Sequence, residues 1–260
     1  MNWLRKTRAG ILLAIAFIAG LVGFLPAHLF ESRLNEALQA RWKITVGGSV
    51  WNGAGVLRSV PSTGTLTVPI TWKFAPRALT RLRAAWHVVP ASPALSGSAK
   101  IGVGWQLVEI SDAALAVDAG TLSQIFPVIG LLAPTGNFLV TTPTDAPLAI
   151  AYGRDFHARG ETEIRIDNLG VGPAGPQPLG NYLVKITARD TIADYKIIQS
   201  GGALKLDGGG SIQTAAPRSI AYAGHATPSP TLPENVLSML KSIGKPDAEG
   251  RLSIDWKAPW

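Results

Sequence analysis

The sequence contains one glycine motif whose spacing could bind a nucleotide. Residues 170–175 match G-x-G-x-x-G and follow a predicted strand. This pattern holds pyrophosphate only where the turn opens a helix, whose first N–H groups bind the phosphate. Three prolines, Pro173, Pro176 and Pro178, remove backbone donors and exclude a helix there. We therefore interpret the motif as a turn and predict no dinucleotide cofactor.

A second motif could supply a nucleophile. Ser238 and Lys241 form S-x-x-K, the serine–lysine spacing of penicillin-binding enzymes. Those enzymes also carry S-D-N and K-T-G motifs, and neither occurs in its expected place here. The same spacing is common on amphipathic helices. We therefore interpret Ser238 and Lys241 as residues of a helix surface.

Histidines and cysteines give no metal site. The chain has no cysteine, which excludes disulfides and thiolate ligands. Its four histidines stand far apart and form no H-E-x-x-H or two-histidine helix pair. They are His28, His87, His157 and His225. We predict no bound metal.

Acidic and basic side chains alternate on one predicted strand. Glu161, Glu163 and Asp167 share a face, with Arg154, Arg159 and Arg165 nearby. Alternating charges on the solvent side of a sheet usually form cross-strand pairs rather than a general acid and base. Because no nucleophile, metal cluster or acid–base pair is evident, we predict a protein that is not an enzyme.

Composition narrows the class of protein further. Hydrophobic residues make up 47% of the chain and charged residues 16%, below the roughly 25% of ordinary soluble domains. Such a composition suits a periplasmic or secreted β-protein. The net charge is +7, but no run of five basic residues occurs, so a nucleic-acid partner is not expected. A weak attraction to anionic lipid headgroups is the better explanation of the excess positive charge.

Residues 9–30 contain no Lys, Arg, Asp or Glu. Their 22 residues would span about 33 Å as a helix, enough for the roughly 30 Å hydrocarbon core. Three basic residues precede them, so the positive-inside rule places residues 1–8 in the cytoplasm and residues 31–260 in the periplasm. A cleavable signal peptide is the alternative. The length, and the lack of a clean A-x-A site before Glu31, favour a permanent inner-membrane anchor.

The rest of the chain is dominated by alternation of apolar and polar residues. In residues 65–74 every second side chain is apolar, which predicts a half-buried strand. Pro69 lacks a ladder donor, so this strand should lie at an edge or carry a bulge. Similar alternation recurs to the end of the chain, between glycine-rich segments that we interpret as turns, such as residues 201–202 and 208–210. We predict a mainly β fold, with a curled antiparallel sheet after the transmembrane helix.

A few short helices should accompany this sheet. The candidates are residues 31–42, 76–86, 121–132 and 233–243, and Thr121 is the candidate N-cap of the third. The last has apolar residues at helical spacing, begins after a proline and ends at Gly244. Since a one-sided sheet must cover its apolar face, we predict that residues 233–243 form a lid over it.

The order of several short motifs resembles the general secretion pathway protein N family of the type II secretion system. The motifs are G-S-V-W-N-G with Trp51, I-T-W with Thr71 and Trp72, L-G-N-Y at residues 179–182, and G-R-L-S-I-D-W at residues 250–256. They follow a basic N-terminus and one anchor, so the likeness spans nearly the whole chain. The resemblance implies a single-pass inner-membrane component of a Gram-negative machine that exports folded proteins across the outer membrane.

The resemblance also implies partners and the absence of catalysis. Members of this family are accessory proteins that can contact the outer-membrane secretin or the inner-membrane platform, without catalytic residues or cofactors. A strand such as residues 65–74 could bind a partner by strand addition. Trp51, Trp72 and Thr71 are the candidate partner contacts, although tryptophans on strands often belong to a core.

The fold is also similar to the AsmA-like group of envelope proteins, whose curled sheets are associated with lipid handling. An open apolar face would then bind or conduct lipid along the sheet. Retained lipid in the purified protein would favour this alternative over the protein-contact function.

Overall fold

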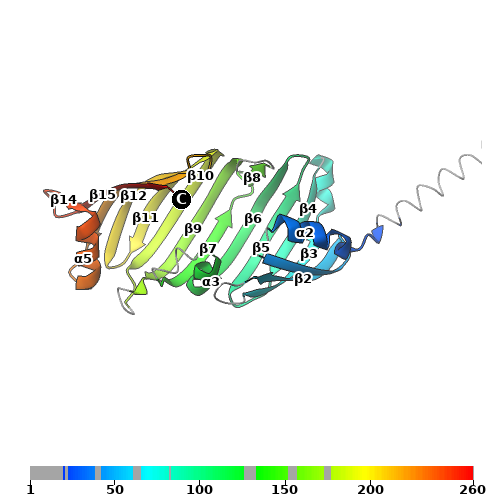
Figure 1. The fold of residues 1–260 in the computed structure, drawn as a ribbon, viewed down its shortest axis with the longest axis horizontal. Helices are drawn as coiled ribbons and strands as arrows, with labels where there is room; N and C mark the ends of the chain where they lie inside the picture. The colour runs from blue at the N-terminus through cyan, green and yellow to red at the C-terminus, as the bar shows by residue number, and fades with distance from the viewer. Residues whose placement is uncertain are drawn as a thin grey trace, which may run out of the picture. The chain divides into compact units, whose positions relative to one another are not determined.

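The structure is a computed structural model, and it describes residues 20, 23–38, 42–60, 66–81, 83–125, 133–151, 157–172 and 177–259. Figure 1 shows mostly β-strands with a few short helices. The strand pairs whose register the structure describes are antiparallel, which confirms the mainly β fold class with short helices. The chain divides into two compact units, Met1–Phe74 and Ala75–Trp260.

The predicted transmembrane anchor falls largely outside the described residues, which include only residues 20 and 23–30 of it. None of the described helices has both the length and the apolar character that crossing a membrane requires. The described chain continues with a 3-10 helix, η1 (Ala27–Phe30), and the α-helix α2 (Glu31–Ala37). The helix predicted over residues 31–42 is therefore too long, because Trp42 starts a strand rich in β-branched residues.

The described residues of the first unit form three strands, β1 (Trp42–Gly48), β2 (Asn52–Ser59) and β3 (Thr67–Phe74). β2 pairs with both others in unbroken register, so the bulge predicted for Pro69 is absent from the pairing with β2. Ser59 N–H donates to Leu66 O and Phe74 N–H donates to Trp51 O.

The second unit holds the other strands in one sheet. Their order is β4-β5-β6-β7-β9-β10-β11-β12-β13-β15-β14, and β8 pairs with both β6 and β9. β7 and β8 occupy consecutive stretches of the space between β6 and β9. The strands are β4 (Ala84–Pro90), β5 (Leu95–Val103), β6 (Leu107–Asp118), β7 (Thr135–Thr142), β8 (Leu148–Ala151), β9 (His157–Gly170), β10 (Gly180–Asp190), β11 (Ile192–Gly201), β12 (Leu204–Gln213), β13 (Ser219–Pro228), β14 (Lys245–Pro246) and β15 (Leu252–Pro259).

The register of the strands in the second unit separates an apolar face from a polar one. One row of paired residues crosses five strands and is entirely aliphatic: Leu115, Val140, Ile164, Val184 and Ile197. The adjacent row, one residue along each strand, is Ala114, Thr141, Glu163, Lys185 and Lys196. The alternation of apolar and polar residues along each strand therefore gives the sheet two chemically different faces.

Two predicted helices need correction. η2 (Pro76–Arg81) is a 3-10 helix, and the helix predicted over residues 76–86 is wrong beyond it because Ala84 starts β4. α3 (Ala119–Ile125) begins before Thr121, so the candidate N-cap at Thr121 is wrong. Asp118 caps this helix instead, since its Oδ1 accepts the N–H of Thr121 at 2.9 Å. Residues 126–132 lie outside the described part of the chain.

Candidate functional site

The residues that could have done chemistry are dispersed over the structure. Ser238 and Lys241 are exposed on the helix α5 (Glu234–Ile243), while Val236 and Leu240 are buried. Gly170 ends β9, and residues 173–176 of the glycine motif are not among the described ones. Within the described ranges, no group of three or more His, Asp and Glu side chains could hold a metal ion.

The acidic strand face predicted from the sequence forms a cross-strand ion pair. Lys185 Nζ lies 2.8 Å from Glu163 Oε1, and the two residues are direct partners in the β9–β10 register. The hydrogen bond to Glu163, followed by its charge, raises the pKa of Lys185. The interpretation of Glu163 as a member of a cross-strand pair is thus confirmed. Both side chains are partly exposed, so the pair contributes little to stability.

The two candidate tryptophans of the first unit support its own turn between β1 and β2. Trp72 Nε1–H donates to Ser49 O at 3.1 Å, and the indole lies against Gly53. Trp51 packs edge-on against Phe74, with ring centroids 4.6 Å apart and an interplanar angle of 80°. Both tryptophans are half-buried. Their contacts within the unit fix the conformation of residues 49–52.

Thr71 lies on the other face of the same sheet and is exposed. It pairs with Ala54, and both line a shallow depression together with Thr45, Val56 and Pro69. The depression is built from small and β-branched residues and carries no charged side chain in its lining. The structure therefore separates Thr71 from Trp72, as alternation along β3 requires.

The helix α2 covers the outer edge of β1, a feature that the sequence reasoning missed. The side-chain amide of Asn35 accepts the N–H of Ile44 at 2.7 Å and donates to its carbonyl at 3.0 Å, as a neighbouring strand would. Glu31 Oε2 accepts the N–H of Val46 at 3.0 Å. These side chains therefore occupy edge groups that could otherwise pair with another strand.

The core of the second unit lies between α5 and the last strands of the sheet. Val236 and Leu240 point from α5 onto the apolar face, where they meet Leu252 and Ile254 of β15. The predicted lid over residues 233–243 is confirmed. Ile243 is an exception, since 57% of it is exposed at the helix end. The cluster comprises Leu179, Leu204, Tyr222, Ala226, Leu232, Val236, Leu240, Leu252 and Ile254.

Three tyrosines lie on this apolar face. The hydroxyl of Tyr182 donates to Leu204 O at 2.6 Å, and that of Tyr195 donates to Ala221 O at 2.9 Å. The hydroxyl of Tyr222 is buried and has no hydrogen-bond partner in the described part of the chain. Burial raises the pKa of Tyr182 to about 12 and raises the pKa of the other two phenols as well. All three are therefore neutral near pH 7 and keep the face uncharged.

Two glycines leave room for the side chain of Tyr222. A Cβ added to Gly224 would lie 2.6 Å from the Tyr222 hydroxyl oxygen, and one added to Gly208 would lie 2.9 Å from it. The sequence contains the signal for this arrangement, because residues 208–210 are all glycine. The interpretation of these glycines as turn residues is wrong, since they lie within β12.

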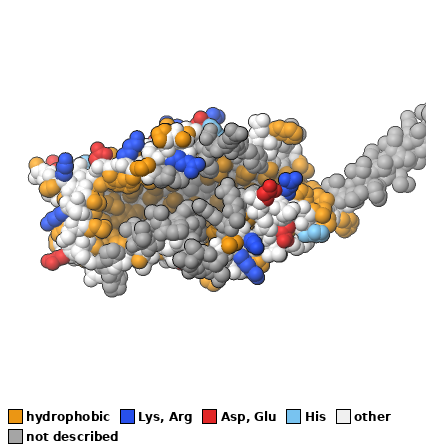
Figure 2. All heavy atoms as spheres, in the orientation of Figure 1, with side chains coloured by type: hydrophobic (Ala, Val, Ile, Leu, Met, Phe, Trp, Pro, Cys, Tyr) orange, Lys and Arg blue, Asp and Glu red, His pale blue; other side chains and the backbone are white. Residues whose placement is uncertain are grey.

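The apolar face continues beyond the strands that α5 covers. Figure 2 shows hydrophobic side chains gathered in a hollow beside α5. The aliphatic row from Leu115 to Ile197 lies on the same face as Tyr195, and its members are half-buried. An apolar chain could bind there by contact with side chains alone.

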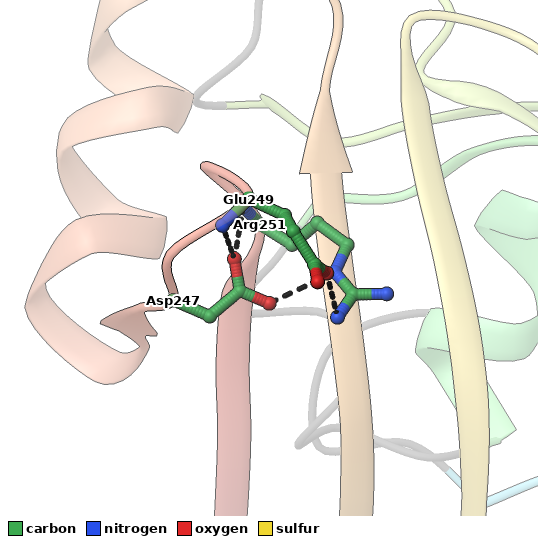
Figure 3. Close-up of polar contacts among 3 residues, drawn as sticks. All are labelled: Asp247, Glu249 and Arg251. Atoms are coloured by element: carbon green, nitrogen blue, oxygen red, sulfur yellow. Dashed lines mark hydrogen bonds and ion pairs between the residues drawn. The ribbon is translucent and has the colours of Figure 1, made fainter.

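An ionic turn connects β14 to β15 (Figure 3). Arg251 Nε lies 2.8 Å from Asp247 Oδ2, and the guanidinium also contacts Glu249. Asp247 Oδ1 accepts the backbone N–H groups of Glu249 and Arg251 at 3.0 and 2.8 Å. Desolvation raises the pKa of Asp247, but the hydrogen bonds from Arg251 and Glu249 together outweigh it, so this pKa lies below its ordinary value.

Comparison with known families identifies the family of this chain. The family model described as type II secretion system (T2SS), protein N matches residues 41–255. The match covers β1 to β14 and the first half of β15, including the candidate contacts and the core under α5. No curated protein and no solved structure matches the chain.

Proposed function

Because the chain belongs to the type II secretion system protein N family, we propose that it is a non-enzymatic accessory component of that machinery. The family match over residues 41–255 is the observation that carries this proposal. The component supports export of folded periplasmic proteins across the outer membrane by protein contacts. Its partners are other proteins of the system, namely the outer-membrane secretin or the inner-membrane platform.

The proposed topology rests on the N-terminal sequence. Residues 9–30 form a permanent inner-membrane anchor, residues 1–8 remain in the cytoplasm, and residues 31–260 lie in the periplasm. A reporter that is active only in the periplasm, fused after Trp260, should be active in cells. Activity of a cytoplasm-specific reporter at the same position would overturn this topology.

The proposed contact surface is the first unit. Thr71 is exposed in an uncharged depression, and Trp51 and Trp72 hold the neighbouring turn in one conformation. A partner strand or loop that meets this sheet would bury Thr71 first, while the half-buried tryptophans would contribute from the turn. The outer edge of β1 is closed at Ile44 and Val46, which favours a contact through the face over strand addition there.

Photocrosslinking in cells tests this surface. A photoreactive residue at position 71 should crosslink to the secretin or to a platform protein. The matched control is position 105, where Trp105 is 95% exposed in the second unit. Equal crosslinking from both positions, or none from position 71, would remove the first unit as the contact surface.

The apolar face favours a second function, which is to bind or conduct lipid from the inner membrane. The observation behind it is the aliphatic row that continues past the lid, together with the hollow in Figure 2. Native mass spectrometry of the detergent-extracted protein should then find co-purified lipid. A Val184→Glu variant, which places a charge in the row, should lose that lipid, while Lys185→Glu on the polar face should keep it. Protein free of lipid in all three preparations would eliminate this function.

A further inference from the structure

The last long strand, β15, has one edge that is only partly paired. Its inner edge pairs with β13 from Leu252 to Pro259. On its outer edge β14 pairs only with Leu252 and Ser253, since β14 begins at Lys245, directly after the end of α5. Within the described ranges no strand pairs with the outer edge after Ser253. Unpaired backbone groups of this kind are a template for another strand.

The ionic turn indicates which backbone groups face outward. Asp247 N–H donates to Arg251 O at 2.8 Å, and Arg251 N–H donates to Asp247 Oδ1 at 2.8 Å. The backbone of Arg251 therefore faces the outer side. Every second residue of a strand directs its N–H and C=O to the same side. Asp255 and Lys257 consequently present their backbone groups outward.

The side chains of this edge carry unmatched charges on one face and a tryptophan on the other. Asp255 and Lys257 are exposed, and their cross-strand partners in β13 are Ala223 and Ala221. Neither charge has an ion-pair partner in the described part of the chain. Trp256 lies on the apolar face opposite Tyr222, and 42% of it is exposed.

We propose that this edge pairs with the same edge of a second copy of the chain, antiparallel and with the two-fold axis at Trp256. In this register Asp255 of each copy faces Lys257 of the other. Their outward N–H and C=O groups then exchange hydrogen bonds, and Trp256 meets its counterpart in the adjacent non-hydrogen-bonded pair. The two apolar faces continue on the same side of the joined sheet, and the two indoles pack together.

A second copy fits this edge because the order of charges is self-complementary. Exposed lysines on an edge normally oppose the addition of a strand. Here an aspartate lies two residues before the lysine, so an antiparallel strand with the same order of charges neutralises both, and a second copy supplies such a strand. Pro259 lacks an N–H and ends the paired segment. The inference does not depend on the proposed function, because it uses only this edge.

Single cysteines test the register, because the natural chain has none. Cα atoms of a non-hydrogen-bonded antiparallel pair lie about 4.5 Å apart, within the range of a disulfide. Trp256→Cys in the full chain, in membranes, should therefore form a disulfide-linked dimer. In a dimer of Asp255→Cys alone, or of Lys257→Cys alone, the two cysteines are diagonal neighbours more than about 7 Å apart, which is too far for a disulfide. A disulfide should therefore form only when the two variants are co-expressed, because position 255 of one copy faces position 257 of the other.

Trp105→Cys, on an exposed turn of the same unit, measures crosslinking by collision. Crosslinking of Trp256→Cys that does not exceed this control would overturn the proposal. So would equal crosslinking of Asp255→Cys and Lys257→Cys each by itself. A product of Trp256→Cys with a different protein only would assign the edge to another partner and would equally overturn it.

A charge exchange tests the same interface without altering Trp256. Asp255→Lys and Lys257→Asp each place like charges opposite one another in both symmetric pairs. Each should raise the dimer dissociation constant at least about tenfold, measured by sedimentation of the detergent-solubilised full chain. The double variant restores opposite charges and should return to within about threefold of the natural chain. A natural chain that is monomeric at all concentrations, or a double variant as weak as the single ones, would contradict the dimer.

Discussion

Individual residues of the first unit show that a candidate binding side chain can instead stabilise the fold. Alternation in the sequence predicts that Trp72 and Thr71 lie on opposite faces, and the structure has them so. The sequence could not predict that the Trp72 ring lies on Gly53, because that neighbour depends on the strand register. Of the three candidate contacts, Thr71 is the exposed one.

Gly53→Ala tests the packing of Trp72. An added Cβ would lie 2.3 Å from Trp72 Cζ2 and 2.5 Å from Gly47 O, so the ring or the backbone must shift. We expect a loss of about 1–3 kcal/mol in the free energy of unfolding, measured by urea titration with tryptophan fluorescence. Gly47→Ala is the control, since its nearest atom would be 3.8 Å away. Equal stability of the two variants would show that the indole is free to move.

The sequence predicts a single helix or strand correctly where the residues that determine it are close together in the chain. The start of α5 after Pro233 and its end at Gly244 follow from helix-terminus chemistry, and its apolar spacing predicts a lid. The helices at residues 31–42 and 76–86 were predicted too long because helical spacing continued into residues that pairing partners hold in β1 and β4. The role of Asn35 and Glu31 at the edge of β1 could not be predicted without knowing which edge is outermost.

Leu240→Ala tests the contribution of α5. Leu240 is 5% exposed and packs in the core cluster, so its truncation should cost about 2–5 kcal/mol of unfolding free energy in urea titrations. Met239→Ala on the same helix removes a side chain that is 39% exposed and should cost far less. Similar losses from both substitutions would mean that α5 does not pack on the sheet as described.

Asp247→Asn tests the ionic turn through its pH dependence. The folded-state pKa of Asp247 lies below the ordinary 3.8, so its contribution to stability is present above that value and is lost as pH falls through the folded-state pKa. The difference in Tm between the natural chain and the variant should be largest near about pH 6 and shrink towards about pH 3. Asp145→Asn, an exposed carboxylate in the turn before β8, is the control. A difference that does not change with pH would contradict the role of the carboxylate.

At the scale of the whole molecule, the mainly β class and the family follow from the sequence, because alternation and the order of short motifs extend over most of the chain. The division into two units does not, since no linker marks residue 74. The sheet register likewise emerges only in the structure. It places aliphatic residues from five strands in one row, although each strand contributes only every second residue to that face.

Secretion by cells that lack this chain tests the proposed role most directly. In a strain with a working type II secretion system, deletion should leave folded secretion substrates in the periplasm, and expression of the natural chain should return them to the medium. Cell fractionation with activity assays of the substrates measures both. Unchanged secretion after deletion would contradict a role in this pathway.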